Sequence, residues 1–182
     1  MSPVSASVEA LLDLAIRHVN AGQRDRARLL CDQAVATHPP HPAVQQLLAV
    51  ISLQDGDAAA AVERAASSLA LRPGHPPTLR VAADAWFQLS AERHAQGDSG
   101  GEEQALQQVL KLAPERTEAE VNLGIVLQER GAIDAAMRAY GRAYRLREDC
   151  FGRIAHALAT AQVGRLWVNL DDLRAELRAV PA

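Results

Sequence analysis

The segment AEVNLGIVLQERGAIDAAMRAYGRAYRL (residues 119–146) determines the fold expected for this chain of 182 residues. Apolar residues recur through the segment at the spacing of one helix face, and Gly131 interrupts the pattern near its middle. Glycine often ends a helix, because it adopts a left-handed backbone conformation at little steric cost. The segment therefore predicts two helices joined by a short turn.

The same pattern recurs along the chain. Gly22, Gly56, Gly97 and Gly131 are separated by 34, 41 and 34 residues, and Pro39, Pro73 and Pro114 lie 17 residues after the first three glycines. Small residues keep the same phase, namely Ala15, Ala49, Ala83 and Gly124 in the first helices and Ala27, Ala61 and Ala136 in the second helices. Each unit is therefore predicted to be helix, glycine turn, helix and proline break.

This pattern resembles the tetratricopeptide repeat. Residues 117–150 match it best and place the family's residue types at Leu123, Gly124, Gly131, Ala136, Tyr140 and Ala143, although Glu148 stands where the closing proline is usual. The resemblance covers residues 8–150. It implies an all-α fold, a tetratricopeptide-type α-solenoid of four helix-turn-helix repeats at 8–41, 42–75, 76–116 and 117–150, with C-terminal capping helices in 151–182. The alternative is an irregular helical bundle.

The third repeat departs from the pattern by a seven-residue insertion near Leu89 to Ala95. Seven residues are about two helical turns, which preserve the face of a helix and lengthen it by about 10 Å. We therefore expect one extended helix from about Pro77 to Gln96, followed by a mobile loop from Gly97 to Gly101.

Composition narrows the class of protein. Hydrophobic residues make up 48% of the chain but aromatic residues only 3%, which favours helices rich in Ala and Leu. The net charge is −3 and no Lys/Arg block occurs, so nucleic acid is not an expected partner. The N-terminal residues carry charges at helical spacing, which argues against a signal peptide and membrane insertion. Two cysteines make no disulfide framework, so we expect a cytoplasmic protein, and the Ala- and Arg-rich composition is typical of high-GC bacterial genomes.

No catalytic, metal-binding or cofactor-binding residues are predicted. His38, His41 and His75 fall in turns between repeats, with no cysteine or carboxylate pair converging on them in sequence. Cys31 occupies a core position, and Cys150 is expected to be more accessible, but neither has a histidine placed to activate it. We therefore expect a protein that is not an enzyme and that binds no cofactor.

The resemblance places function on the first helix of each repeat. In the family these helices line a concave face on which peptides or helices bind. The corresponding positions are Leu12, Ile16, Val19, Gln46, Val50, Leu53, Arg80, Asp84, Phe87, Val121, Ile125 and Gln128. The alternative for the aliphatic members is a place in the core between repeats. Some family members grip an acidic C-terminus with Lys, Arg and Asn at such positions, and Leu12, Ile16 and Gln46 exclude that clamp here.

The expected function is a non-catalytic protein–protein interaction adaptor or assembly scaffold. The alternatives are a secretion-type chaperone and a self-assembling scaffold subunit. Residues 170–180 present Leu170, Leu173, Leu177 and Val180 on one helix face, with Asn169 or Asp171 as the N-cap. That face must pack on something, either the preceding helix around Ile154 and Leu158 or a second chain in a homo-oligomer.

Overall fold

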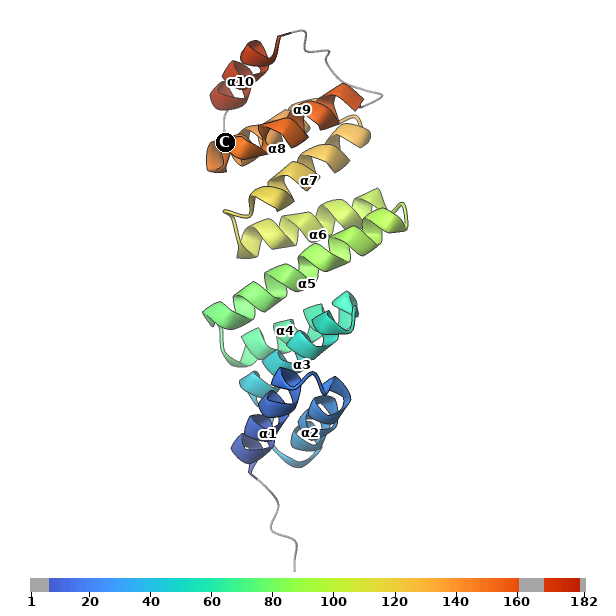
Figure 1. The fold of residues 1–182 in the computed structure, drawn as a ribbon, viewed down its shortest axis with the longest axis vertical. Helices are drawn as coiled ribbons and strands as arrows, with labels where there is room; N and C mark the ends of the chain where they lie inside the picture. The colour runs from blue at the N-terminus through green and yellow to red at the C-terminus, as the bar shows by residue number, and fades with distance from the viewer. Residues whose placement is uncertain (1–6, 161–168, 181–182) are drawn as a thin grey trace, which may run out of the picture. The chain divides into compact units, whose positions relative to one another are not determined.

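The structure is a computed structural model that describes residues 7–160 and 169–180. These residues form ten α-helices and one short 3-10 helix, and no strand occurs among them (Figure 1). The chain divides into two compact units, Met1–Ala85 and Trp86–Ala182, and the division falls within α5. The expected all-α class is confirmed.

The helices alternate in pairs along both units. The first unit contains α1 (Val8–Asn20), α2 (Arg24–Thr37), α3 (Pro42–Gln54), α4 (Ala58–Leu71) and the first half of α5 (Pro76–Ala95). The second unit contains the rest of α5, α6 (Ser99–Leu112), α7 (Thr117–Glu129), α8 (Ile133–Leu146), a 3-10 turn (Glu148–Cys150), α9 (Phe151–Thr160) and α10 (Leu170–Ala179).

The repeated glycines set the turns within the pairs. Gly22, Gly56, Gly97 and Gly131 have φ angles of 74°, 81°, 72° and 77°. Only glycine adopts this left-handed region freely, so a side chain at any of the four positions would strain the turn. The period seen in the sequence therefore corresponds to a repeated backbone conformation.

Alanines let the helices of each pair approach closely. Ala15, Ala27, Ala49 and Ala61 have no exposed surface, as the repeat register predicts. Around them the core of the first unit contains Leu11, Cys31, Ala34, Val44, Leu48 and Ile51. Burial raises the pKa of the Cys31 thiol to about 11, so the thiol stays protonated at neutral pH and serves as a small apolar side chain.

Ala61→Leu should lower the free energy of unfolding by about 2 kcal/mol, because the larger side chain overpacks the contact between helices. Urea unfolding followed by circular dichroism measures the change. Ala59→Leu is the matched control, because Ala59 lies on the same helix and is exposed. Equal stability of the two variants would contradict the repeat register.

The seven-residue insertion is helical. Leu89–Ala95 continue α5 without a break, which confirms the expected extension. The predicted mobile loop is wrong in part, because Ser99, Gly100 and Gly101 form the first turn of α6. The Asp98 side chain caps that turn by accepting a hydrogen bond of 2.9 Å from the Gly101 amide.

The C-terminal helix packs within the same chain. Leu173 and Leu177 of α10 are buried against Tyr144 and Ile154, and α10 lies mainly on α8. Asn169 caps α10 by accepting from the Asp171 amide at 2.8 Å. The expectation for Cys150 is wrong, because the 3-10 turn carries it into this core. Leu166 and Trp167, two apolar residues that precede α10 in the sequence, lie outside the described residues.

Candidate protein-binding surface

The predicted surface in the first unit lies on α1 and α3, which contact each other. Ile16 is 40% exposed, whereas Leu12 and Val19 on the same helix are half-buried against the core. Val50 and Leu53 on α3 are half-buried as well. These aliphatic side chains are therefore partly buried and partly exposed to solvent.

The polar members of the same surface differ in how strongly they are held. The Gln46 side-chain oxygen accepts a hydrogen bond of 3.1 Å from the hydroxyl of Thr78, which is fully buried. Thr78 also contacts the His75 Nδ1 atom at 2.9 Å, so His75 has a structural partner. Arg80 and Asp84 are exposed on α5. Gln46 is thus fixed in place, whereas Arg80 and Asp84 put exposed, charged side chains at the repeat positions that Gln46 and Val50 hold on α3.

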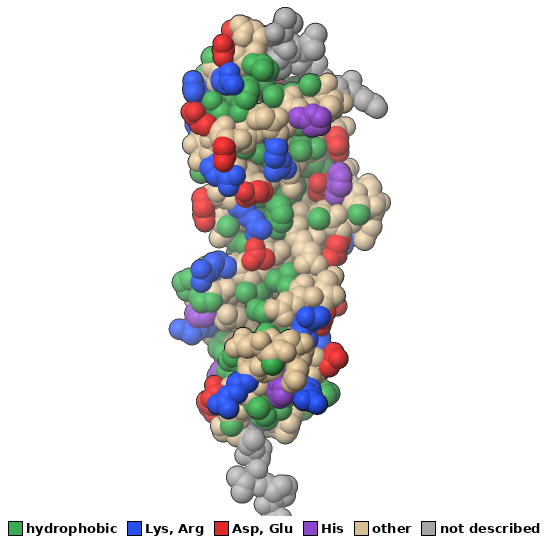
Figure 2. All heavy atoms as spheres, in the orientation of Figure 1, with side chains coloured by type: hydrophobic (Ala, Val, Ile, Leu, Met, Phe, Trp, Pro, Cys, Tyr) green, Lys and Arg blue, Asp and Glu red, His purple; other side chains and the backbone are tan. Residues whose placement is uncertain are grey.

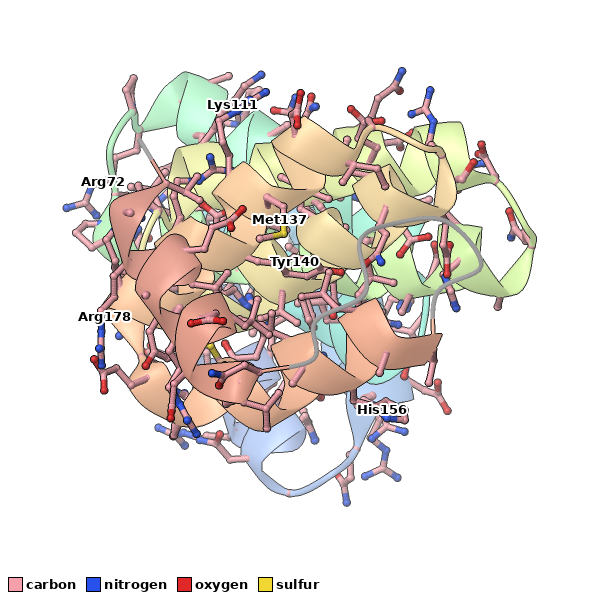
Figure 3. The ribbon with its side chains drawn as sticks, turned by 90° about the horizontal axis from the view of Figure 1, so that it is seen from above. Arg72, Lys111, Met137, Tyr140, His156 and Arg178 are labelled. Atoms are coloured by element: carbon pink, nitrogen blue, oxygen red, sulfur yellow. The ribbon has the colours of Figure 1, made fainter. Side chains whose placement is uncertain are left out.

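Two predicted positions in the second unit are not accessible. Val121 is fully buried in the core that also holds Tyr140 and Ile154, so it packs between helices and cannot meet a partner. Gln128 is 3% exposed, and its side-chain oxygen accepts a hydrogen bond of 2.8 Å from the Tyr140 hydroxyl. Figure 3 shows Tyr140 among the helices, where burial raises its pKa. Gln128 therefore supplies the hydrogen-bond acceptor that the buried Tyr140 hydroxyl requires.

The other two predicted positions of the second unit are half-buried. Ile125 packs against the same core as Val121. Phe87 on α5 packs against the core cluster that contains Leu106 and Leu123, and the guanidinium carbon of Arg116 lies 4.2 Å from the centre of its ring. This cation–π contact covers part of the ring, so Phe87 offers a partner less apolar surface than the sequence suggests.

Glu102 and His94 form a polar pair that the sequence did not predict. The buried Glu102 carboxylate lies 3.0 Å from the His94 Nδ1 atom, across the turn that joins α5 to α6. Burial raises the pKa of Glu102, and the contact with His94 opposes that rise. The sequence hinted at this pair only in that Glu102 occupies a position where the other repeats place alanine. Its partner lies in the inserted turns, for which the other repeats offer no equivalent.

The pH dependence of stability should change in Glu102→Gln. Because its folded-state pKa is raised, the folded chain holds a proton at Glu102 more tightly than the unfolded chain does. The free energy of unfolding should therefore fall as pH rises from about 4.5, the ordinary value, through the raised pKa. Glu102→Gln should remove that decrease, measured by urea unfolding from acid to neutral pH. Glu63→Gln, an exposed position, should keep the wild-type profile, and identical profiles for all three proteins would exclude a role for Glu102.

The described residues contain no cluster of His, Cys, Asp and Glu that could hold a metal ion. In the same part of the chain, no helix is both long and apolar enough to cross a membrane. The geometry within each unit is instead that of packed helix pairs with partly exposed apolar side chains.

Proteins of known structure share this architecture. The tetratricopeptide repeat profile matches residues 8–51. The crystal structure of MamA is similar with a TM-score of 0.56 and 20% identity, over 79% of this chain and 80% of that one. YrrB, described as a tetratricopeptide-repeat protein with an unusual peptide-binding site, is similar with a TM-score of 0.62 and 14% identity, over 95% of this chain and 87% of that one. Residues 8–51 thus match the tetratricopeptide repeat, and the described part of the chain shares the helical fold of these structures.

One curated relative bears an enzyme's name. A probable biofilm formation methyltransferase, WspC of Pseudomonas putida, is 34% identical over 85 residues. The match covers 47% of this chain but only 18% of that protein. This chain therefore corresponds to a small part of that relative.

Proposed function

We propose that this protein is a non-catalytic interaction adaptor or scaffold that binds a peptide or helix of its partner on the α1–α3 surface. Ile16 carries the proposal, because it is an aliphatic side chain that is 40% exposed one helical turn from the half-buried Leu12, while the half-buried Val50 holds the corresponding repeat position on α3. An aliphatic residue from a partner would remove this surface from water. The peptide-binding description of YrrB, which shares the fold, supports the same kind of use.

The chemistry of the surface favours an apolar or amphipathic segment. Leu12, Ile16 and Val50 carry no charge, and the side-chain oxygen of Gln46 already accepts a hydrogen bond from Thr78. Affinity would come from apolar contacts, and the exposed Arg80 and Asp84 would add selectivity at the margin. A secretion-type chaperone and a self-assembling subunit remain alternatives that would use the same surface for a different partner.

Ile16→Glu and Val50→Glu should each weaken partner binding by about tenfold or more, because a carboxylate would have to be desolvated in an apolar contact. A photo-crosslinking residue at position 16 first identifies the partner in native extract, and purified components then give the dissociation constants. Leu29→Glu is the matched control. Leu29 is 69% exposed on α2, so its substitution tests a carboxylate on another face of the same unit.

The proposal fails if Ile16→Glu and Val50→Glu bind the crosslinked partner as well as wild type does. It also fails if a crosslinker at position 29 captures the same partner with equal yield. Circular dichroism of Ile16→Glu and Leu29→Glu should show wild-type helicity, since both side chains are exposed.

A further inference from the structure

A hollow lies in the second unit, on a surface that the sequence did not single out. It is formed by α6, α7 and α8 and has a volume of about 530 Å³. Its apolar lining comes from Leu110, Leu123, Leu127 and Ala135. Leu123 is almost fully buried, whereas Leu110, Leu127 and Ala135 are half-buried and open to solvent. Several apolar side chains of a partner would fit there, but no folded domain would.

Charged side chains surround this apolar lining. Glu120 and Arg142 form a bidentate pair, with N–O distances of 2.7 and 2.9 Å. Glu103 pairs with Arg130 and also accepts from Gln107 at 3.1 Å. Both carboxylates at the hollow are therefore already neutralised by protein partners. Figure 2 shows hydrophobic side chains between charged ones of both signs in the region of α6 and α7.

Two cations at the same rim have no such partner. Lys111 and Arg138 are exposed, and within residues 7–160 and 169–180 neither forms an ion pair or a side-chain hydrogen bond. Lys111 lies at the edge of the helices in Figure 3. The rim therefore carries uncompensated positive charge from α6 and from α8.

The equivalent place in the first unit lacks these features. In the repeat register Lys111 corresponds to Ala36, Arg138 to Glu63 and Leu127 to Ser52. The general packing of such helices thus requires neither the two cations nor the additional leucine. The second unit has a particular surface chemistry, an apolar hollow with a basic rim.

We propose that the α6–α8 hollow binds an acidic amphipathic segment of a partner protein. Apolar side chains of the segment fill the hollow above Leu110 and Leu127. Its carboxylates pair with Lys111 and Arg138, because these cations are the charges that the hollow leaves uncompensated. This site is distinct from the α1–α3 surface and uses charge as well as apolar contact for recognition.

The test uses the full chain and a labelled synthetic peptide of about 14 residues, with leucines spaced for one helix face and Glu and Ala elsewhere. Fluorescence anisotropy should show saturable binding that weakens as salt increases. The double variant Lys111→Glu/Arg138→Glu should weaken binding by about tenfold or more and should prefer a peptide in which Lys replaces each Glu. A peptide with Ser in place of each Leu should not bind, and Leu110→Ser should weaken the leucine peptide.

Two controls separate this site from general charge effects and from the α1–α3 surface. Arg26→Glu/Arg72→Glu makes the same change in net charge at exposed residues of the first unit and should leave binding unchanged. Ile16→Glu should leave it unchanged too. The proposal is overturned if no saturable binding occurs, if acidic and basic peptides bind wild type equally, or if Lys111→Glu/Arg138→Glu has no effect. Sedimentation that shows a dimer abolished by the double variant would assign the hollow to a second copy and would also overturn it.

Discussion

Gly124→Ala should lower the free energy of unfolding by about 3 kcal/mol, although alanine is usually the better helix residue. A Cβ atom at position 124 would lie 2.9 Å from the Cζ atom of Tyr140 and still closer to two other carbons of that ring. The ring is fully buried, and its hydroxyl is held by Gln128 at 2.8 Å. Tyr140 therefore cannot move aside without losing a buried hydrogen bond.

Gly152→Ala is the matched control for this prediction. Gly152 is exposed on α9, and a Cβ atom there would have no heavy atom within 4 Å. Its substitution should raise stability by about 0.5–1 kcal/mol, because it reduces the freedom of the unfolded chain. Urea unfolding at one temperature compares both variants with wild type. Stabilisation by both substitutions would show that α7 and α8 do not approach as closely as the Gly124–Tyr140 contact requires.

The same contact shows why the fold could be predicted from the sequence. The small residue at 124, the turn glycine at 131 and the aromatic residue at 140 occur in one repeat, and all three are fixed by the close approach of two helices. Because each repeat has the same close approach of two helices, the same residue types recur at a fixed spacing. That spacing can be seen in the sequence. The extension of α5 was predictable for a related reason, because seven residues keep the helix face and no Pro or Gly interrupts Leu89–Ala95.

The candidate site was less predictable, because exposure depends on contacts that do not repeat. Val121 occupies the same repeat position as Gln46, yet it is buried among Tyr140, Ile154 and the α10 leucines. Gln128 is buried because a tyrosine at position 140 needs an acceptor, whereas Cys31 holds the corresponding place in the first repeat. Glu102 required a partner from the inserted turns. Each departure depends on residues that the repeats do not share.

Substitution of the buried leucines of α10 should have the largest effect on the second unit. Leu173→Ala and Leu177→Ala should each lower its free energy of unfolding by about 2–5 kcal/mol, because each leaves a cavity in a closed core. The helix end is also tied to α8, since Arg145 donates hydrogen bonds to the backbone oxygens of Leu177 at 3.3 Å and Val180 at 2.7 Å. Leu170→Ala on the same helix, where the leucine is 50% exposed, should cost much less.

Truncation after Val163 tests whether α10 acts as a cap or joins two chains. It would expose the apolar side chains of Tyr144 and Ile154 that Leu173 and Leu177 now cover. We expect a lower melting temperature and aggregation of a chain that is otherwise monomeric, measured by calorimetry and by light scattering after size exclusion. Conversion of a stable dimer into a stable monomer would instead make α10 an oligomerisation element. Because the leucine substitutions keep the helix, their loss of stability would then depend on protein concentration, whereas loss from an intramolecular cap would not.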